Sequence, residues 1–405
     1  MLGCVFRGSR GYWIWMAGLA AGMAAGGIAY SDQIEHGLAV THLSDQVSWG
    51  AYIANFTYLV GVAAASVLLV VPTYVYHRQD LKQVVLIGEL LAVSAIVMCL
   101  GFVVVDLGHP ERGLHMLPGI GRLNFPSSIL AWDVIVLNGY LLLNLHVPGY
   151  LLYQEFRGRT PRRRYYLPWV LISILWAVSI HTVTAFLYSG FGGRPFWNTA
   201  ILAPRFLVSA FASGPALLII AFYAINRTGA FHIGKSVFVY LRRVMSFTLP
   251  LNFFLLGCEL FAEFYTDSAH VMSAEYLFFG IHGHGLLVPY IWSGLGMGLV
   301  AMVIVLTPPL HTRPGWLAAA CLLTVVGVWV EKGMGLIVPG FVPSPAGDLV
   351  EYAPSAQEFW VSLGIWCFGA ALFTVMAKVA LAIKSGRLRA ADAPPHEGQA
   401  AASPG

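Results

Sequence analysis

Several ionisable residues lie inside or at the end of apolar stretches of this sequence, where charge is otherwise sparse. Asp106 closes one such stretch, Glu89 lies earlier in the same stretch, and Asp133, His181 and Glu259 lie within others. A charged group at the centre of a bilayer costs about 2.5–3.5 kcal/mol on insertion scales, so such groups usually serve a function. Carboxylates and imidazoles at a water boundary can exchange protons with a reacting molecule. His181 and Asp106 are therefore the leading candidates for proton handling, and Glu89, Asp133 and Glu259 for a proton path.

The segment from Val103 to Trp132 joins two apolar stretches and concentrates polar groups. It reads VVVDLGHPERGLHMLPGIGRLNFPSSILAW, with ionisable side chains at Asp106, His109, Glu111, Arg112, His115 and Arg122. Such a cluster at a membrane boundary forms either the wall of a site or a solvated loop with helix caps. His109 is the candidate binding residue of this loop.

A quinone head group fits this combination of polar and apolar residues. Its two carbonyl oxygens need hydrogen-bond donors and a proton route, while apolar walls accommodate its isoprenoid tail. Trp49, Tyr52 and Asn55 offer donors at the start of one apolar stretch. Tyr188 follows His181 by seven residues, which places both on one face of a helix. The sequence thus favours a polar cavity that several helices share and that opens outward.

Structural roles compete with these functional ones for any single residue. A lone histidine such as His181 is more often a hydrogen-bonded core residue than a functional one, and Asp133 beside Trp132 is consistent with a helix cap. Glu331 and Lys332 are consistent with a charged pair at the membrane boundary. Only the set of polar groups at one end of several helices favours a shared site.

Two other classes of membrane protein share some of these features. A cytochrome b needs histidines on facing helices, and His181 could face His282 or His284, but the inner half offers only His146. A transporter needs broken helices, and the Gly-rich run 280–298 could be such a break. Neither CxxC nor CxxCH occurs, so this chain has no iron–sulfur motif and no c-type haem motif of its own. We expect a chain without an iron–sulfur cluster, a haem or a metal site, with the cytochrome b kept as an alternative.

The composition identifies the class of fold. Of the 405 residues, 58% are hydrophobic and 10% are charged. Only helices and closed barrels satisfy their backbone in lipid, and the apolar runs lack the alternation of barrel strands. We predict an all-α polytopic membrane protein with a single membrane domain over residues 1–389 and a disordered cytoplasmic tail over 390–405. The ten predicted helices are Tyr12–Tyr30, Trp49–Tyr76, Val84–Val105, Ser127–His146, Leu167–Tyr188, Pro204–Ile225, Val237–Phe261, Leu277–Leu306, Trp316–Val338 and Phe359–Ile383.

Basic residues alternate with acidic ones from loop to loop, which predicts the orientation. Cytoplasmic loops of membrane proteins carry an excess of Lys and Arg. The basic side comprises Arg7, Arg10, Arg78, Lys82, Arg157, Arg159, Arg162, Arg163, Arg164, Arg227, Lys235, Arg242, Arg243, Arg313, Lys384, Arg387 and Arg389. We expect a multi-pass protein of the bacterial inner membrane with both termini in the cytoplasm.

Three long stretches resemble one known family. They are WGAYIANFTYLVGVAAASVLLVVP at 49–72, DLGHPER at 106–112 and SIHTVTAFLYSGFGGRPFWNTAILAPRF at 179–206. Together they resemble the membrane subunits of the NrfD/PsrC, or polysulfide reductase, family across most of helices two to nine. The resemblance is greatest to its DsrP branch, the ten-helix members of complexes of dissimilatory sulfur metabolism. The family most often has Arg where this chain has His109.

The resemblance implies an architecture and a set of partners. It implies two four-helix bundles, about 49–188 and 204–338, with the first and last helices added. It also implies that menaquinone or ubiquinone binds near the outer face, with Trp49, Tyr52 and Asn55 on one contacting helix and His181 or Tyr188 on another. The implied partners are an extracytoplasmic ferredoxin-like iron–sulfur subunit, a triheme cytochrome c, a membrane cytochrome b and a cytoplasmic iron–sulfur subunit.

The sequence therefore predicts a quinone-reactive membrane subunit. It would exchange electrons between the quinone pool and an iron–sulfur partner, with proton exchange at the outer face. A haem-binding cytochrome, a transporter and a structural anchor remain the alternatives.

Overall fold

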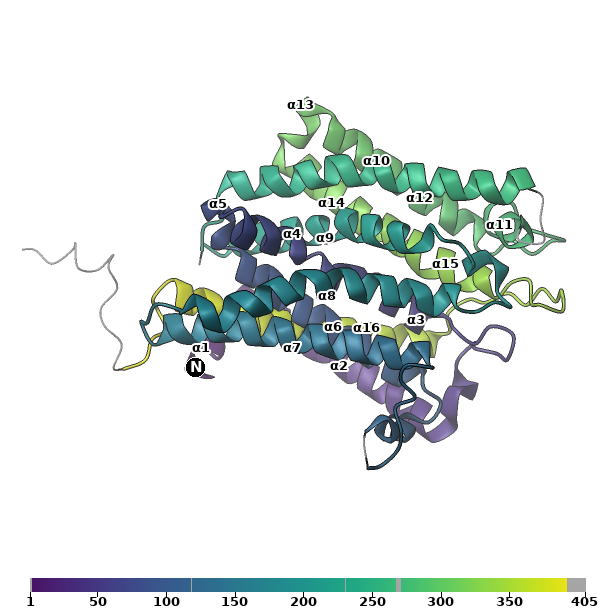
Figure 1. Cartoon of the computed structure of the whole chain (residues 1–405), viewed down its shortest axis with the longest axis horizontal. Helices are drawn as coiled ribbons and strands as arrows, with labels where there is room; N and C mark the ends of the chain where they lie inside the picture. Colours follow the sequence, from purple (N-terminus) through teal and green to yellow (C-terminus); the bar gives the residue numbers. More distant parts are fainter. Residues whose placement is uncertain (1, 118, 230, 267–270, 392–405) are drawn as a thin grey trace, which may run out of the picture.

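Long helices lie side by side along one direction of the molecule (Figure 1). The computed structural model describes residues 2–117, 119–229, 231–266 and 271–391. Within these residues, ten helices are long and apolar enough to cross a membrane. The prediction of an all-α polytopic membrane protein with about ten spans is confirmed. Of the predicted disordered tail, all but residues 390 and 391 lie outside the described residues.

Most spans extend a few residues past their predicted ends, because helical backbone continues beyond the apolar part of the sequence. The fourth predicted helix, for example, continues ten residues past His146. The main helices are α2 (Arg10–His36), α3 (Ala51–Ala64), α6 (Val85–Asp106), α7 (Ile129–Phe156), α8 (Arg163–Ser189), α9 (Leu202–Arg227), α10 (Lys235–Thr266), α12 (Val288–Leu306), α14 (Pro314–Trp329) and α16 (Ala356–Lys384). Shorter elements extend them: α3 is followed by α4 (Val67–Val70) and the π-helical η2 (Val71–Val75), and α14 by the π-helical η5 (Val330–Met334), α15 (Gly335–Ile337) and the 3-10 helix η6 (Val338–Gly340).

Helix α3 is the most deeply buried of the spans. Most of its residues are apolar and nearly all of them are buried, which is the pattern of a helix surrounded by protein. It packs against α6, α8, α9 and α16, while α7 packs on α8, and α14 on α9 and α12. Polar side chains of α3 therefore meet other helices rather than lipid. The division into two four-helix bundles stays a prediction.

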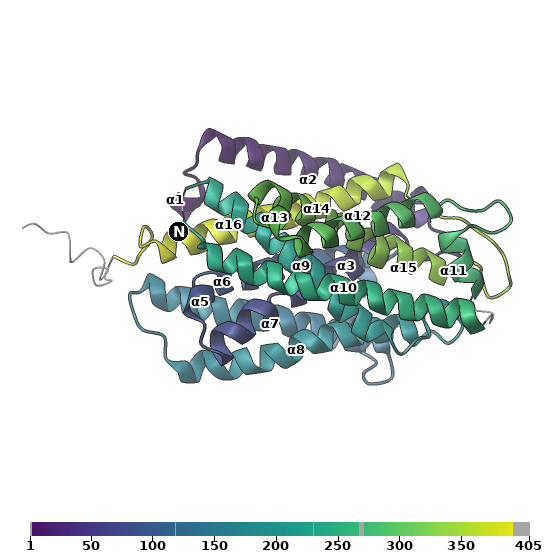
Figure 2. The ribbon, with the colours of Figure 1, turned by 90° about the horizontal axis from the view of Figure 1, so that it is seen from above.

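The first and last spans, α2 and α16, pack against each other at the edge of the molecule (Figure 2). Gly26 and Gly364 lie at their contact, where a Cβ added to Gly26 would come within 2.5 Å of the Gly364 Cα. Small residues at such a contact allow two helix backbones to approach closely in a membrane. Helix α16 also packs along α6 and against α3, and α2 reaches both through Gln33.

The predicted helix Leu277–Leu306 is wrong in its first third. The chain forms the short helix α11 (Val271–Phe278), then a tight turn with an Ile281–His284 bridge, and only then α12. Gly280 and Gly283 adopt positive φ angles of 80° and 87°, which end the helix. His282 and His284 consequently lie in this turn rather than in a span, and neither is buried.

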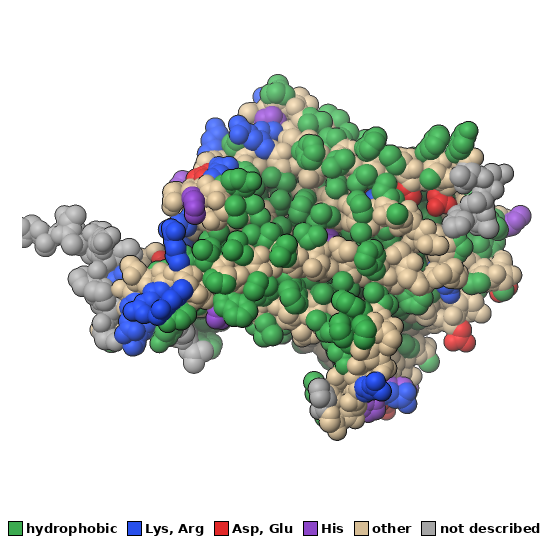
Figure 3. Space-filling model, in the orientation of Figure 1, with side chains coloured by type: hydrophobic (Ala, Val, Ile, Leu, Met, Phe, Trp, Pro, Cys, Tyr) green, Lys and Arg blue, Asp and Glu red, His purple; other side chains and the backbone are tan. Residues whose placement is uncertain are grey.

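The two ends of the bundle differ in charge. Lys and Arg side chains gather at the end where α5 (Gln79–Lys82) and α1 (Leu2–Val5) lie, and apolar side chains cover the flank between the ends (Figure 3). We call this the basic end and its opposite the far end. The first described residues and the end of α16 both lie at the basic end (Figure 1).

Candidate functional site

Four charged side chains meet in the half of the molecule nearer the far end. Arg205, near the start of α9, forms ion pairs with Glu259 of α10 and Glu331 of η5, the latter at 3.1 Å between Nη2 and Oε1. Lys332 lies 3.8 Å from Glu331 between Nζ and Oε1. Each of the four is no more than 6% exposed. We call Arg205, Glu259, Glu331 and Lys332 the ion cluster.

Local backbone geometry brings the ion cluster together. The π-helical turn η5 inserts an extra residue into the span that follows α14. Two adjacent charged residues then face different spaces: Glu331 lines a pocket together with Arg205 and Glu259, and Lys332 lines a second pocket. Asn252 of α10 donates a hydrogen bond of 2.8 Å to the free Glu331 oxygen and so fixes this carboxylate.

The ion cluster is balanced in charge but not in hydrogen bonds. Two carboxylates offset one guanidinium and one ammonium, which limits the cost of burying ions in a medium of low dielectric constant. The Lys332 ammonium nevertheless makes no hydrogen bond with any described residue. A buried donor without a partner usually marks a bound water or a functional role.

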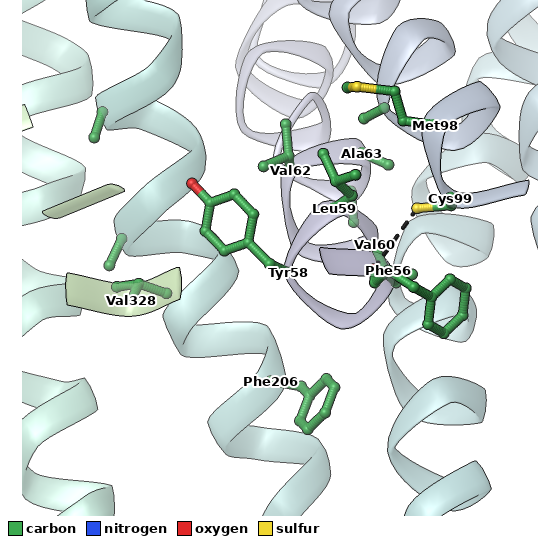
Figure 4. Close-up of a cluster of buried hydrophobic side chains, with 14 of the residues drawn as sticks. Phe56, Tyr58, Leu59, Val60, Val62, Ala63, Met98, Cys99, Phe206 and Val328 are labelled. Carbon is green, nitrogen blue, oxygen red and sulfur yellow. Dashed lines mark hydrogen bonds between the residues drawn. The ribbon is translucent and has the colours of Figure 1, made fainter. Parts of the chain in front are cut away.

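His181 lies on the wall of the same second pocket as Lys332. This pocket is small, with room for about one water molecule, and is bounded by α3, α8, α9 and the end of α14. The His181 side chain is 1% exposed, and its Nε2 makes no hydrogen bond with any described residue. Figure 4 shows Tyr58, Phe206 and Val328, from three different helices, around this region.

A second polar region surrounds the start of α3. The Tyr52 hydroxyl donates to Gln33 Oε1 at 2.6 Å, and Gln33 Nε2 donates to the Val105 carbonyl at 2.6 Å. Asp106, the next residue, has one buried oxygen without a hydrogen-bond partner among the described residues. It lies within electrostatic range of Tyr52 and Glu358. We call Gln33, Tyr52, Asp106, Tyr352 and Glu358 the α3 network.

Glu358 joins the α3 network to α16 and to two loops. It is fully buried, accepts a hydrogen bond from the Tyr352 hydroxyl, and accepts backbone N–H groups of His42 at 3.1 Å and Ser355 at 2.9 Å. Tyr352 in turn accepts the Ala51 N–H at 2.8 Å, at the first residue of α3. Burial, together with the Glu358 carboxylate, raises the pKa of Tyr352 above its ordinary value, so its hydroxyl remains a donor.

Asn55 is fully engaged in structural hydrogen bonds. Its amide donates to the Ala51 carbonyl at 2.8 Å, and its Oδ1 accepts the indole N–H groups of Trp329 at 3.0 Å and Trp366 at 2.9 Å. The side chain therefore ties α3 to α14 and α16. Binding a head group through Asn55 would require breaking one of these contacts.

Trp49 and Tyr188 belong to an aromatic cluster at the far end. The Trp49 ring lies 5.8 Å from Tyr188, 6.0 Å from Trp197 and 5.9 Å from Phe341 between ring centroids. The Tyr188 hydroxyl is hydrogen-bonded to Thr57. Trp49 is half-buried, and no hydrogen bond of its indole N–H is found within the described residues, so it is the accessible donor of this cluster.

The other predicted residues lie apart from one another. Asp133 is buried and accepts a hydrogen bond of 2.8 Å from Thr184. Glu89 is buried toward the basic end, within electrostatic range of Lys384. His109 is exposed in the loop after α6 and pairs with Glu111 at 3.0 Å. The structure thus brings Tyr52 together with Asp106, and Trp49 with Tyr188, but it separates Glu89 and His109 from these pairs.

The sequence did not identify four buried polar residues as members of a site: Gln33, Arg205, Asn252 and Glu358. Arg205 carried a usable signal, because a basic residue near the far end is an exception to the distribution of positive charge. Glu331 and Lys332, for which a boundary pair was one interpretation of the sequence, are buried within the ion cluster. Neutral amides inside apolar helices carry no comparable signal.

The unpartnered buried groups are of types that exchange protons. Within the described residues, no group of three or more His, Cys, Asp or Glu side chains has a metal-binding arrangement. Asp106 and His181 each present an unpartnered buried atom near the far end, and Trp49 presents a donor. A carboxylate oxygen, an imidazole and an indole N–H are suitable partners for the hydroxyl or carbonyl groups of a quinol or quinone.

Known proteins resemble this chain over most of its length. The family described as polysulphide reductase, NrfD, matches residues 39–342. A selenate reductase subunit of Mesobacillus selenatarsenatis is 25% identical over 86% of this chain and 89% of its own length. The Hdr-like menaquinol oxidoreductase integral membrane subunit of Archaeoglobus fulgidus is 24% identical over 89% of this chain and 91% of its own. A Halobacterium salinarum protein, named provisionally as a membrane subunit of dimethyl sulfoxide reductase, is 25% identical over 87% of this chain and 84% of its own.

Proposed function

This chain belongs to the polysulphide reductase NrfD family, and on that premise we propose that it is the quinone-interacting membrane subunit of an oxidoreductase complex. It exchanges electrons between a menaquinone or ubiquinone pool and a partner subunit. The relatives support this proposal, since one is named a menaquinol oxidoreductase subunit and another a selenate reductase subunit.

The observation that carries the proposal is the unpartnered buried oxygen of Asp106 at the far end. A quinol releases two protons with its two electrons, so its site needs a group that accepts a hydroxyl proton near water. Asp106 is such a group, because it ends α6 and still has a free acceptor. Trp49 supplies an accessible donor on the neighbouring helix start, and His181 is the second proton-handling residue. Tyr52, Asn55 and Tyr188 surround this region and help to shape it.

We infer the orientation from the distribution of charge, and the partner subunits from the resemblance to the family. We place the subunit in the bacterial inner membrane with the basic end in the cytoplasm, in accord with the distribution of positive charge. The far end then faces an extracytoplasmic ferredoxin-like iron–sulfur subunit. The further partners are those of a DsrP-type complex of sulfur metabolism: a triheme cytochrome c, a membrane cytochrome b and a cytoplasmic iron–sulfur subunit.

The loop after α6 is the best candidate for the docking surface. Its 3-10 helix η3 (Pro110–Met116) has no buried residue. Apolar side chains are exposed there beside His109, including Leu114 at 56% and Ile120 at 60%. Exposed apolar residues next to charged ones are typical of protein–protein contact sites.

The test is a titration of the purified complex with a fluorescent quinol-site inhibitor, following the quenching of its emission. We expect saturable quenching at one site per chain, displaced by menaquinone. Asp106→Asn should weaken inhibitor binding at least tenfold, whereas the surface variant Asp80→Asn should bind like the wild type. Equal binding by Asp106→Asn and the wild type would exclude Asp106 from the site. Absence of saturable binding by the folded complex would overturn the proposal.

His181 has a separate test, because its role concerns protons rather than affinity. His181→Ala should slow quinol oxidation by the assembled complex. Unchanged turnover would remove His181 from the mechanism. Glu89, Asp133 and Glu259 remain candidates for a proton path, and conservative amide variants at each position, assayed for proton release from liposomes, would rank them.

A further inference from the structure

The pocket between His181 and Lys332 holds unsatisfied polar groups, of which the proposed function uses only His181. We propose that ordered water in this pocket bridges the Lys332 ammonium to the His181 imidazole and makes the two residues a proton-exchanging pair. The inference rests on the proposed function for its role in turnover, but the water site itself does not. It assigns Lys332 as a further proton-handling residue and connects the ion cluster to α8.

The Lys332 ammonium lacks hydrogen-bond acceptors among the residues that the structure describes. Its ammonium has three N–H donors, is 3% exposed, and makes no hydrogen bond within the described part of the chain. Its favourable contacts are the Glu331 carboxylate at 3.8 Å and the face of the Phe206 ring, whose centroid lies 5.7 Å from Nζ. Both are longer than a hydrogen bond, so the three donors still require acceptors.

His181 faces the same space from α8. Its Nε2 lies 3.9 Å from the position that a Cβ on Gly61 would occupy, so the ring is directed at a site where α3 has no side chain. A neutral imidazole has one donor and one acceptor nitrogen. Nε2, the nitrogen directed at this space, makes no hydrogen bond among the described residues. The missing side chain of Gly61 leaves the room in which a partner can sit.

The remaining wall is polar enough to hold water. Tyr58, Thr57, Ser209 and Ser213 contribute hydroxyl groups from α3 and α9. Buried waters usually make about three hydrogen bonds to otherwise unsatisfied groups, whereas purely apolar cavities stay dry. A water here can accept from Lys332 and donate to the unprotonated nitrogen of His181, with a hydroxyl as its third partner.

The proton transfer is balanced in atoms and charge. Lys332 gives a proton to the water oxygen while the water gives one of its own protons to the unprotonated His181 nitrogen. One N–H bond breaks at Lys332, one forms at His181, and the water is regenerated. The charged groups that face Lys332 are Glu331 and, behind it, Arg205, and Glu331 also lines the first pocket together with Glu259.

Gly61→Ala tests the water site with little risk to folding. The added Cβ would lie 3.4 Å from the Ala210 Cβ, which is ordinary contact, and alanine favours a helix over glycine by about 1 kcal/mol. The methyl group would occupy the space next to His181. Gly296→Ala is the matched control, because a Cβ there meets nothing within 4 Å and Gly296 also lies inside a membrane helix.

The readout is radiolytic labelling of the intact complex, in which hydroxyl radicals formed from bound water oxidise adjacent side chains. In the wild type, Tyr58 should be labelled at least fivefold faster than Tyr140, which is equally buried but bonded to Ser66. Gly61→Ala should reduce Tyr58 labelling to the level of Tyr140, and Gly296→Ala should not. Equal labelling of Tyr58 and Tyr140 in the wild type would overturn the water site.

Turnover then tests the exchange of protons. Gly61→Ala and Lys332→Met should each slow quinol oxidation at least fivefold without changing inhibitor affinity. If Tyr58 labelling is lost in Gly61→Ala as expected but turnover is unchanged in both variants, the proton-exchanging role is overturned and only a structural water remains. If labelling is as expected but no quinol-site inhibitor binds to the wild type, the proposed function fails and the hydrated site stands.

Discussion

The α3 network and the ion cluster are both buried and polar, but they differ in how many of their polar atoms have a hydrogen-bond partner. In the α3 network, the side chains of Tyr52, Gln33 and Glu358 all have hydrogen-bond partners. One carboxylate oxygen of Asp106 has no partner among the described residues. In the ion cluster, charges cancel while Lys332 and part of Arg205 keep unused donors. The first arrangement holds helices together, and the second depends on something besides protein, such as water.

The comparison shows that burial of a polar group does not by itself indicate function. Asn55 is 4% exposed and Lys332 is 3% exposed, yet every polar atom of the Asn55 side chain takes part in a hydrogen bond and the Lys332 ammonium makes none. The number of unsatisfied donors and acceptors is the better guide. By that guide, His181, Lys332 and Asp106 are the functional candidates, and Asn55 is a structural one.

The largest effect should come from removing one charge of the ion cluster. Arg205→Met leaves two buried carboxylates with a single cation, and loss of one partner of a buried ion pair costs about 3–5 kcal/mol. The thermal unfolding midpoint of the purified complex should fall accordingly. Arg205→Met combined with Glu259→Gln restores the balance of charge and should recover part of the loss. Equal stability of the double and single variants would show that charge balance does not hold this region together.

Asn55→Ala should have the next largest effect. It leaves the indole N–H groups of Trp329 and Trp366 without an acceptor in the protein interior. Each such orphan costs about 1–3 kcal/mol, and we expect a loss of about 2–3 kcal/mol in unfolding free energy from the two together. Asn55→Asp, which keeps an acceptor oxygen, is the control. A stable Asn55→Ala variant that no longer binds a quinol-site inhibitor would instead place Asn55 in the quinone site.

Tyr52→Phe removes a single hydrogen bond from the α3 network. The expected loss of unfolding free energy is about 1 kcal/mol, because Gln33 keeps its second bond to the Val105 carbonyl. Inhibitor affinity should change less than it does in Asp106→Asn. Loss of affinity equal to that of Asp106→Asn would show that the Tyr52 hydroxyl leaves Gln33 and contacts the ligand.

Asp80→Asn, at the basic end, should have the smallest effect and gives the reference for an exposed pair. Arg78 donates to Asp80 at 2.5 Å, and this bond holds the pKa of the Asp80 carboxyl below its usual range. Both side chains are partly exposed, so the pair contributes less than about 1 kcal/mol. Because the pKa is lowered on folding, that contribution is present above the ordinary pKa of about 4 and disappears as the pH falls through the folded value. Wild type and variant should therefore converge in urea unfolding at acid pH, and a difference that grows with acid would contradict the assignment.

The sequence was sufficient to predict the membrane-spanning helices, because most apolar runs are long enough to be recognised one by one. It was insufficient at residues 277–287, where positive φ angles at Gly280 and Gly283 break an apolar segment into a helix and a turn. A glycine in an apolar run does not reveal whether its φ is positive, since membrane helices also contain many glycines. A continuous helix and a helix followed by a turn could not be separated without the fold.

The sequence also could not predict which side chains form hydrogen bonds or ion pairs with one another. Asn252 and Glu331 are 79 residues apart, and Tyr52 and Gln33 are on different helices. Helix periodicity predicts which face a side chain occupies but not which helix it meets. Asp106 and His181 could be selected as candidates from residue type and position alone. The role of Arg205 becomes clear only from its ion pairs with Glu259 and Glu331.

The π-helical turn η5 has a consequence for the tolerance of this chain to insertion and deletion. A π turn amounts to one residue added to an α-helix, and a single residue corresponds to a rotation of about 100° and a rise of about 1.5 Å. Deleting one residue from Val330–Met334 would therefore rewind the turn and rotate the following segment, including the Leu336 carbonyl that accepts the Trp197 indole N–H at 2.8 Å. Point substitutions leave that alignment in place, so lineages that gain or lose a residue here must rebuild the far end of the molecule in the same step.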